Sequence, residues 1–137
     1  MSIYVLDTSA LLTYIENENG VAEIEQIVME TIDKLHILYI SVISSIEVFY
    51  ITQQEQGATI AHKRLRLLRD LPIIQELVRP DDVICIGELK AKYSMSFADS
   101  CIAGLAKKKS AILIHKDPEF EQLKSDVEQI ILPYKTK

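Results

Sequence analysis

Four acidic residues stand where a short apolar segment ends or where a helical segment begins. Asp7 and Asp117 each follow an apolar run that is typical of a strand, and Glu47 and Asp99 lie early in segments with helical patterns. In open α/β folds the carboxyl ends of parallel strands share one edge of the sheet, and ligands bind there. Four carboxylates at one edge repel one another unless protons or a divalent cation neutralise them. The sequence therefore predicts a metal-dependent site at this edge.

Each acid also has a structural explanation as part of a helix cap. Asp7 and Asp117 precede helical segments, where an aspartate side chain can accept hydrogen bonds from free N–H groups. Glu47 and Asp99 stand three residues after a serine, which is the spacing of a capping box. The two explanations are compatible, because the positive end of a helix dipole keeps a carboxylate ionised. Capping does not require all four acids to meet at one edge, so their coincidence favours a site.

The metal expected at such a site is Mg²⁺, with Mn²⁺ as the alternative. Oxygen ligands predominate among the candidate residues, and hard cations prefer oxygen. The histidines His36, His62 and His115 are far apart in sequence, and Cys85 and Cys101 lack the spacing of a zinc motif. The sequence therefore gives no indication of a zinc site or of a disulfide framework.

Length and composition indicate one globular domain that spans residues 1–137. The chain has 48% hydrophobic residues and a net charge of −5. No apolar run approaches the roughly 20 residues that a membrane helix needs, and the first apolar run is too short for a signal peptide. We therefore expect a cytoplasmic protein with no membrane partner.

Short β-branched runs alternate with longer helical segments, which is typical of a parallel α/β sheet. We predict an α/β fold, with a parallel central sheet of about five strands flanked by helices. Strands are predicted at residues 3–6, 37–41, 111–115 and 128–132, with a weaker edge strand at 73–78. Helices are predicted at residues 8–16, 21–34, 43–56, 58–70, 81–93, 97–108 and 118–125.

The helix predicted at residues 58–70 has a basic side. Such a run of charges is most often a solvated face, and the alternative is a surface that contacts the phosphates of RNA. The acidic net charge argues against a broad nucleic-acid surface. Lys107–Lys109 form a second basic cluster at a helix C-terminus, where the helix dipole favours cations. The candidates for RNA binding on the first helix are Arg64, Arg66 and Arg69.

Four short segments carry the acids in an order that resembles a known family. They read VLDTSALL from Val5, SIE from Ser45, FAD from Phe97 and KDPEF from Lys116. Together they resemble the PIN-domain family, and most closely the small VapC-type toxin ribonucleases of type II toxin–antitoxin pairs. The resemblance runs from the first strand to the last and covers nearly the whole chain.

The resemblance implies a function and a set of site residues. It implies metal-dependent hydrolysis of RNA phosphodiester bonds by a pocket of Asp7, Glu47, Asp99 and Asp117, with Ser9 supporting Asp7. We choose Asp7 and Asp99 as direct metal ligands, whereas Glu47 and Asp117 bind the metal directly or through water. The resemblance also implies a homodimer and a cognate antitoxin, which can insert an arginine-bearing segment into the acidic pocket.

One residue departs from the family pattern, in which a threonine or serine commonly stands two positions before the last aspartate. This chain has His115 at that position. A histidine there can still hydrogen-bond a carboxylate, a water or a phosphate, although a lone histidine at the end of a strand is more often structural. We therefore leave His115 out of the predicted site.

Two other functions remain open from the sequence alone. The first is a PIN-type nuclease of RNA maturation or quality control that has no antitoxin. The second is an inactive binding module whose carboxylates capture a basic partner. The complete set of four acids favours an active enzyme over the binding module.

Overall fold

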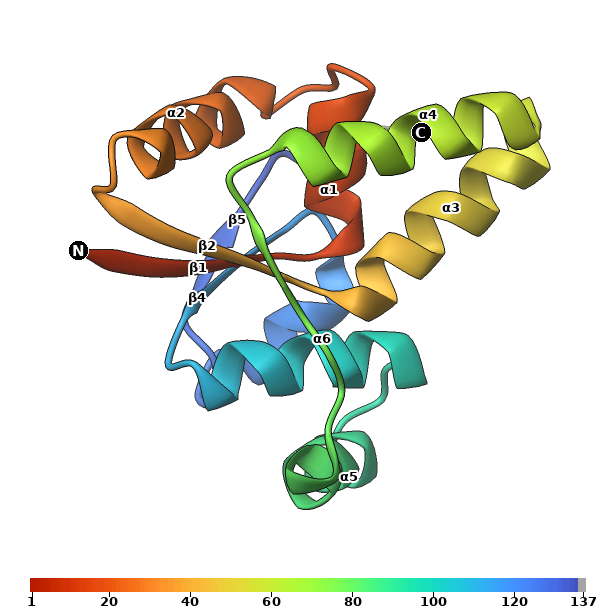
Figure 1. Cartoon of the computed structure of the whole chain (residues 1–137). Helices are drawn as coiled ribbons and strands as arrows, with labels where there is room; N and C mark the ends of the chain where they lie inside the picture. The colour runs from red at the N-terminus through yellow and green to blue at the C-terminus, as the bar shows by residue number, and fades with distance from the viewer. Residues whose placement is uncertain (136–137) are drawn as a thin grey trace.

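Five short strands pair in parallel into one sheet in the order β3-β2-β1-β4-β5 (Figure 1). The computed structural model describes residues 1–135. The predicted parallel α/β sheet is confirmed, and the weak strand lies at its edge as expected. The strands are β1 (Ser2–Leu6), β2 (His36–Ser41), β3 (Ile74–Glu76), β4 (Ile112–His115) and β5 (Gln129–Ile131).

Helices cover both faces of the sheet. The first four α-helices lie on one face, and the last two lie on the other (Figure 1). The α-helices are α1 (Thr8–Ile15), α2 (Val21–Ile32), α3 (Val42–Gln56), α4 (Ala58–Asp70), α5 (Val83–Lys92) and α6 (Phe97–Lys108). Two 3₁₀ helices, η1 (Pro80–Asp82) and η2 (Pro118–Leu123), complete the described part of the chain.

The side chains of the central strands point alternately to the two faces of the sheet, so the apolar core consists of two clusters. Tyr4 and Leu6 of β1 pack with α1 and α2 on one face, whereas Val5 packs with α6 and η2 on the other. Successive side chains of a strand point to opposite faces, so each strand contributes to both clusters. On the second face Gly104 of α6 lets α5 approach closely, because a Cβ there would lie 2.7 Å from Ile86 Cγ1.

One predicted helix has a different geometry. Residues 118–123 form the 3₁₀ helix η2 instead of the α-helix expected at 118–125. Phe120 and Leu123 are both fully buried and stand three residues apart. Side chains at this spacing lie directly above one another in a 3₁₀ helix, so this geometry directs both into the core.

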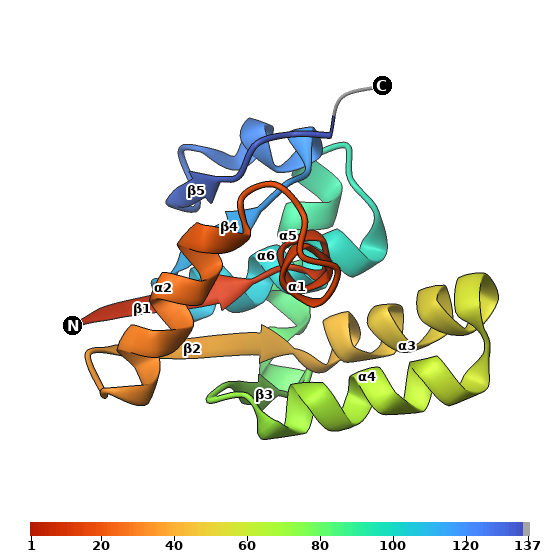
Figure 2. The ribbon, with the colours of Figure 1, turned by 90° about the horizontal axis from the view of Figure 1, so that it is seen from above.

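The strands end at a common edge, and the helices that follow them begin there. α1 begins directly after β1 and α3 directly after β2, while α6 also begins at this edge (Figure 1). The hairpin of α3 and α4 extends beyond the sheet on this side (Figure 2). Within residues 1–135, no helix is both long and apolar enough to cross a membrane.

Candidate active site

Asp7 lies buried at the junction of β1 and α1, with 2% of its surface exposed. The Ala10 N–H donates to Asp7 Oδ1 at 2.9 Å, so the carboxylate caps α1. The Ser9 hydroxyl oxygen lies 2.8 Å from Oδ1 and 2.9 Å from Oδ2. Burial raises the pKa of Asp7 to about 7, against the lowering effect of these hydrogen bonds, and the charge of Asp99 adds to the rise.

Ser9 connects two of the strand ends. Its hydroxyl contacts Asp7 and also accepts a hydrogen bond from the Lys116 N–H at 2.8 Å. Lys116 directly follows β4 and precedes Asp117. The predicted supporting position of Ser9 therefore corresponds to a bridge between the start of α1 and the segment that carries Asp117.

Glu47 lies half-buried in the second turn of α3. The Thr8 hydroxyl donates to Glu47 Oε1 at 2.7 Å, which connects this carboxylate to the residue after Asp7. The expected capping box from Ser44 to Glu47 is wrong, because α3 begins at Val42 and Ser41 is its N-cap. Glu47 therefore has no capping role, and its carboxylate is available for other chemistry.

Asp99 is the third residue of α6, and its backbone N–H donates to the hydroxyl of the N-cap Ser96 at 3.0 Å. Its pKa is raised to about 7. Burial is the largest cause, followed by the charges of Asp117, Glu47 and Glu119. Asp99 therefore lies within the electrostatic reach of every other acid of the site, since its own charge also raises the pKa of Asp7.

Asp117 caps η2 by accepting the Glu119 N–H at 3.0 Å on Oδ1. Asp99, Asp117 and Glu119 each offer a carboxylate oxygen, and these three atoms lie within 4.8 Å of one another. Glu119 is not among the site residues predicted from the sequence, although it belongs to the segment KDPEF. Asp117 is the N-cap of η2 and has an extended backbone, so residue spacing within a helix does not predict that its carboxylate lies near that of Glu119.

Gln122 joins the two segments that carry these three acids. Its side-chain oxygen accepts the Ser94 N–H at 3.1 Å, and its nitrogen donates to the Ser94 carbonyl at 3.0 Å. The same nitrogen lies 2.8 Å from the Glu119 carbonyl oxygen. The amide thus holds η2 against the segment that leads into α6.

The structure brings the four predicted acids to one edge of the sheet. Asp99 and Asp117 belong to the group within 4.8 Å, whereas Asp7 and Glu47 lie outside it and interact with Asp99 through their charges. The catalytic and metal-binding roles of the four acids stay predictions.

The donor atoms suit a hard divalent cation. The three clustered ligands are all carboxylate oxygens. Mg–O distances of about 2.1 Å allow two ligands of one ion to lie up to about 4.2 Å apart, slightly less than the observed spread. The raised pKa values of Asp7 and Asp99 show that the site favours protons when no cation offsets its charge.

The basic side of α4 is only partly free to contact RNA. Arg64 donates to Glu16 at 3.1 Å and to the Thr52 hydroxyl at 3.0 Å. Arg66 and Arg69 are exposed, and neither forms an ion pair within residues 1–135. In the alternative basic cluster, Lys107, Lys108 and Lys109 pair with Asp126, Asp82 and Glu76, respectively.

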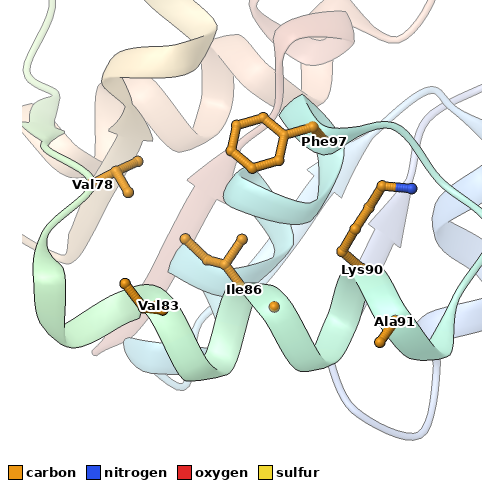
Figure 3. Close-up of a pocket in the computed structure, with 7 residues that line it drawn as sticks. Val78, Val83, Ile86, Lys90, Ala91 and Phe97 are labelled. Atoms are coloured by element: carbon orange, nitrogen blue, oxygen red, sulfur yellow. The ribbon is translucent and has the colours of Figure 1, made fainter.

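An apolar groove of about 420 Å³ lies between α5 and the start of α6 (Figure 3). Phe97 forms one wall and is 65% exposed. It stands two residues before Asp99, so the groove lies beside the acidic cluster. Val83, which also lines the groove, and its neighbour in sequence Ile84 are exposed as well. The other lining residues are Val78, Ile86, Gly87, Lys90 and Ala91.

Comparison with known proteins agrees with this geometry. The sequence pattern of the PIN domain matches residues 4–125. No curated protein sequence matches the chain.

Several solved structures are similar to the whole chain. VapBC2 from Rickettsia felis, solved with a DNA fragment from its promoter, has a TM-score of 0.78 at 16% identity, covering 96% of this chain and 99% of that chain. DNA-bound VapBC from Salmonella typhimurium has a TM-score of 0.75 at 17% identity, covering 96% and 98%. VapC20 from Mycobacterium tuberculosis, described as a toxin that cleaves the sarcin–ricin loop, has a TM-score of 0.68 at 17% identity, covering 96% and 100%. At these identities the similarity establishes the fold.

Proposed function

The chain belongs to the PIN domain family, and from this premise we propose that it is a metal-dependent endoribonuclease, the toxin of a toxin–antitoxin pair. The observation that carries the proposal is the group of carboxylate oxygens of Asp99, Asp117 and Glu119 within 4.8 Å, at the edge where Asp7 and Glu47 also lie. The VapC and VapBC structures with the same fold support the assignment to a toxin. The proposal places the reaction in the cytoplasm.

The carboxylates of Asp7, Asp99, Asp117 and Glu119 would hold Mg²⁺ or Mn²⁺. When bound, such an ion polarises a phosphate oxygen and lowers the pKa of an attacking water. Ser9 orients the carboxylate of Asp7 through its hydroxyl contact. The Thr8 hydroxyl donates to one oxygen of Glu47, and the Tyr50 hydroxyl lies 3.5 Å from the other. Held in this way, the Glu47 carboxylate would orient the water or accept its proton.

The direct test is cleavage of RNA by the purified chain. We expect cleavage in Mg²⁺ or Mn²⁺, complete loss on chelation, and recovery when the metal is added back, because the carboxylates alone cannot offset the charge that develops on the phosphate. Full activity in excess chelator would contradict metal dependence. Absence of cleavage with every RNA tried, together with metal binding, would favour the binding module.

We propose two protein partners. The first is an antitoxin, supported by the VapBC complexes among the similar structures, and a basic side chain of such a partner would complement the acidic cluster.

The second is another copy of this chain, contacting the apolar groove and the exposed Val83 and Ile84. Sedimentation should show a dimer that Ile84→Glu converts to monomer, and a monomeric parent would contradict this second proposal.

We propose that Arg66 and Arg69 contact substrate phosphates, since acids already bind Arg64 and the lysines of the alternative cluster. Changing both to alanine should weaken RNA binding and reduce the slope of log affinity against log salt by roughly 0.7 for each lost contact. Filter binding at several salt concentrations measures this slope. Lys34→Ala/Lys63→Ala removes the same charge from two exposed lysines that form no ion pair within residues 1–135. An equal effect of both pairs of substitutions would indicate only general attraction.

A nuclease of RNA maturation or quality control that has no antitoxin is the second candidate. The acidic cluster would cleave RNA in the same way in either nuclease. Expression of the chain alone, and then together with the product of a neighbouring short reading frame, would separate the two. Growth arrest that the neighbour relieves supports the toxin, whereas the absence of arrest by an active nuclease supports the second candidate.

A further inference from the structure

His115, the last residue of β4, is completely buried although it carries a polar ring. The ring packs against Phe120 of η2 with 5.0 Å between the ring centroids. It stands two residues before Asp117, at the position where the PIN family commonly has threonine or serine. The proposed metal binding and catalysis do not involve the ring of His115.

A chain of hydrogen bonds runs through the ring and returns to η2. The Asp117 N–H donates to His115 Nδ1 at 3.1 Å. On the other side of the ring, Nε2 lies 2.8 Å from Gln129 Oε1. The Gln129 side-chain nitrogen then donates to the Phe120 carbonyl at 2.6 Å. The chain therefore begins and ends on the backbone of the turn that carries Asp117 and Glu119.

The two ends of this chain determine the position of every hydrogen within it. A backbone N–H can only donate, so Nδ1 of His115 must be unprotonated, and the proton is on Nε2. A carbonyl can only accept, so the Gln129 amide must point its nitrogen at Phe120 and its oxygen at the ring. The ring is therefore neutral, with an unprotonated Nδ1 and its single proton on Nε2.

The hydrogen bonds fix both ends of the turn to the sheet. His115 holds the start of the turn at Asp117, and Gln129, the first residue of β5, holds it at Phe120. Between these points the Asp117 carboxylate accepts the Glu119 N–H. The direction of both carboxylates toward Asp99 thus depends on a turn whose backbone is held by two strands.

We propose that His115 is a positioning residue, which with Gln129 fixes the turn from Asp117 to Phe120 so that Asp117 and Glu119 face Asp99. The bond to the N–H two residues later is one that a short serine, threonine or asparagine side chain also makes in a turn. This equivalence explains how histidine can replace the hydroxyl residue of the family. The consequence for metal binding rests on the proposed function.

Two substitutions of His115 distinguish the effect of its hydrogen bond to Asp117 from the effect of its packing against Phe120. His115→Phe keeps a ring against Phe120 and removes the acceptor, whereas His115→Asn loses the ring and keeps an acceptor for the Asp117 N–H. We expect the Mn²⁺ affinity to fall by about 10-fold to 100-fold in His115→Phe, as for other residues that orient metal ligands, and to remain close to the parent value in His115→Asn. Calorimetric titration with Mn²⁺ measures both affinities.

Gln129→Leu is the second variant, for use if His115→Phe does not fold. It leaves the buried ring in place and removes the connection to the Phe120 carbonyl. We expect a loss of Mn²⁺ affinity in this variant as well, with melting curves in chelator confirming that it folds. Unchanged affinity in folded His115→Phe, or in folded Gln129→Leu where His115→Phe does not fold, would overturn the positioning role.

Nuclear magnetic resonance gives a readout that does not depend on activity. The ¹⁵N shifts of the ring should show the proton of His115 on Nε2, and the Asp117 amide should exchange slowly in the parent and in His115→Asn but fast in His115→Phe. A proton on Nδ1, or equal exchange in all three proteins, would overturn the proposal. If these signatures hold while the parent neither binds Mn²⁺ nor cleaves RNA, the proposed function fails and the positioning of the turn stands.

Discussion

Changing Asp99 to asparagine is expected to lower the rate of RNA cleavage by roughly a thousandfold. The substitution keeps the shape of the side chain and removes a carboxylate that belongs to the acidic cluster with Asp117 and Glu119. Metal ions contribute several kcal/mol to stabilising the charge of a transition state, and about 4 kcal/mol corresponds to a factor of a thousand. Single-turnover cleavage at saturating RNA and fixed Mg²⁺ measures the change.

Asp126→Asn provides the matched control for this experiment. Its carboxylate binds Lys92, Lys107 and Tyr93, and it is outside the acidic cluster. The same chemical change there should leave the cleavage rate close to that of the parent. Equal rates in Asp99→Asn and the parent would show that Asp99 has no part in the reaction.

Glu119 can be tested in the same assay. Glu119→Gln should slow cleavage, because its carboxylate belongs to the group within 4.8 Å. Glu121 stands two residues later in η2 and pairs with Lys124, so Glu121→Gln is its control. If only the Asp99 variant is slow, Glu119 neighbours the site without taking part in the reaction.

The sequence predicted the fold well where each element depends on local signals. Apolar runs before Asp7 and Asp117 located β1 and β4, and the helix predicted at residues 97–108 has the bounds of α6. Parallel pairing then followed from the alternation of strands and helices. The convergence of the acids at one edge needed nothing beyond this topology.

The parts that failed depend on contacts between distant residues. η2 is a 3₁₀ helix in which Phe120 and Leu123 are both fully buried. Glu119 approaches Asp99 only because η2 lies against the segment that leads into α6. The role of His115 depends on Gln129, fourteen residues later on another strand. The N-cap of α3 is Ser41, the last residue of β2, and not the expected Ser44.

The metal-free protein is expected to lose stability as the pH rises from 5 to 8. Asp7 has a pKa of about 7 in the folded chain and an ordinary value of 3.8, so the folded state binds its proton more tightly than the unfolded state does. The resulting stability is fully present below pH 3.8 and is lost as the pH rises through about 7. The full rise of about three units corresponds to on the order of 4 kcal/mol, of which roughly 3 kcal/mol is lost between pH 5 and pH 8. Asp99 adds a smaller amount of the same sign, because solvent screens its less buried carboxylate.

Urea unfolding in chelator at pH 5 and pH 8 measures this loss. Asp7→Asn should remove most of the pH dependence and make the metal-free protein more stable at pH 8, since the amide oxygen can still accept the Ala10 N–H that caps α1. A purely capping carboxylate predicts a different result, because it would stabilise the charged form and lose about 1 kcal/mol when replaced by alanine. Lower stability of Asp7→Asn at pH 8 would therefore favour the cap over the repelling cluster.

Asp126→Asn shows what a carboxylate with the opposite shift does. Hydrogen bonds from Tyr93, Lys107 and Lys92 lower the pKa of Asp126 to about 2, so its contribution is present above pH 3.8 and is lost only as the pH falls through about 2. Its substitution should lower stability equally at pH 5 and pH 8.

Mg²⁺ should stabilise the parent more at pH 8 than at pH 5, because the cation then competes with fewer protons for Asp7 and Asp99. An equal effect of Mg²⁺ at both pH values would place its binding site away from these two acids.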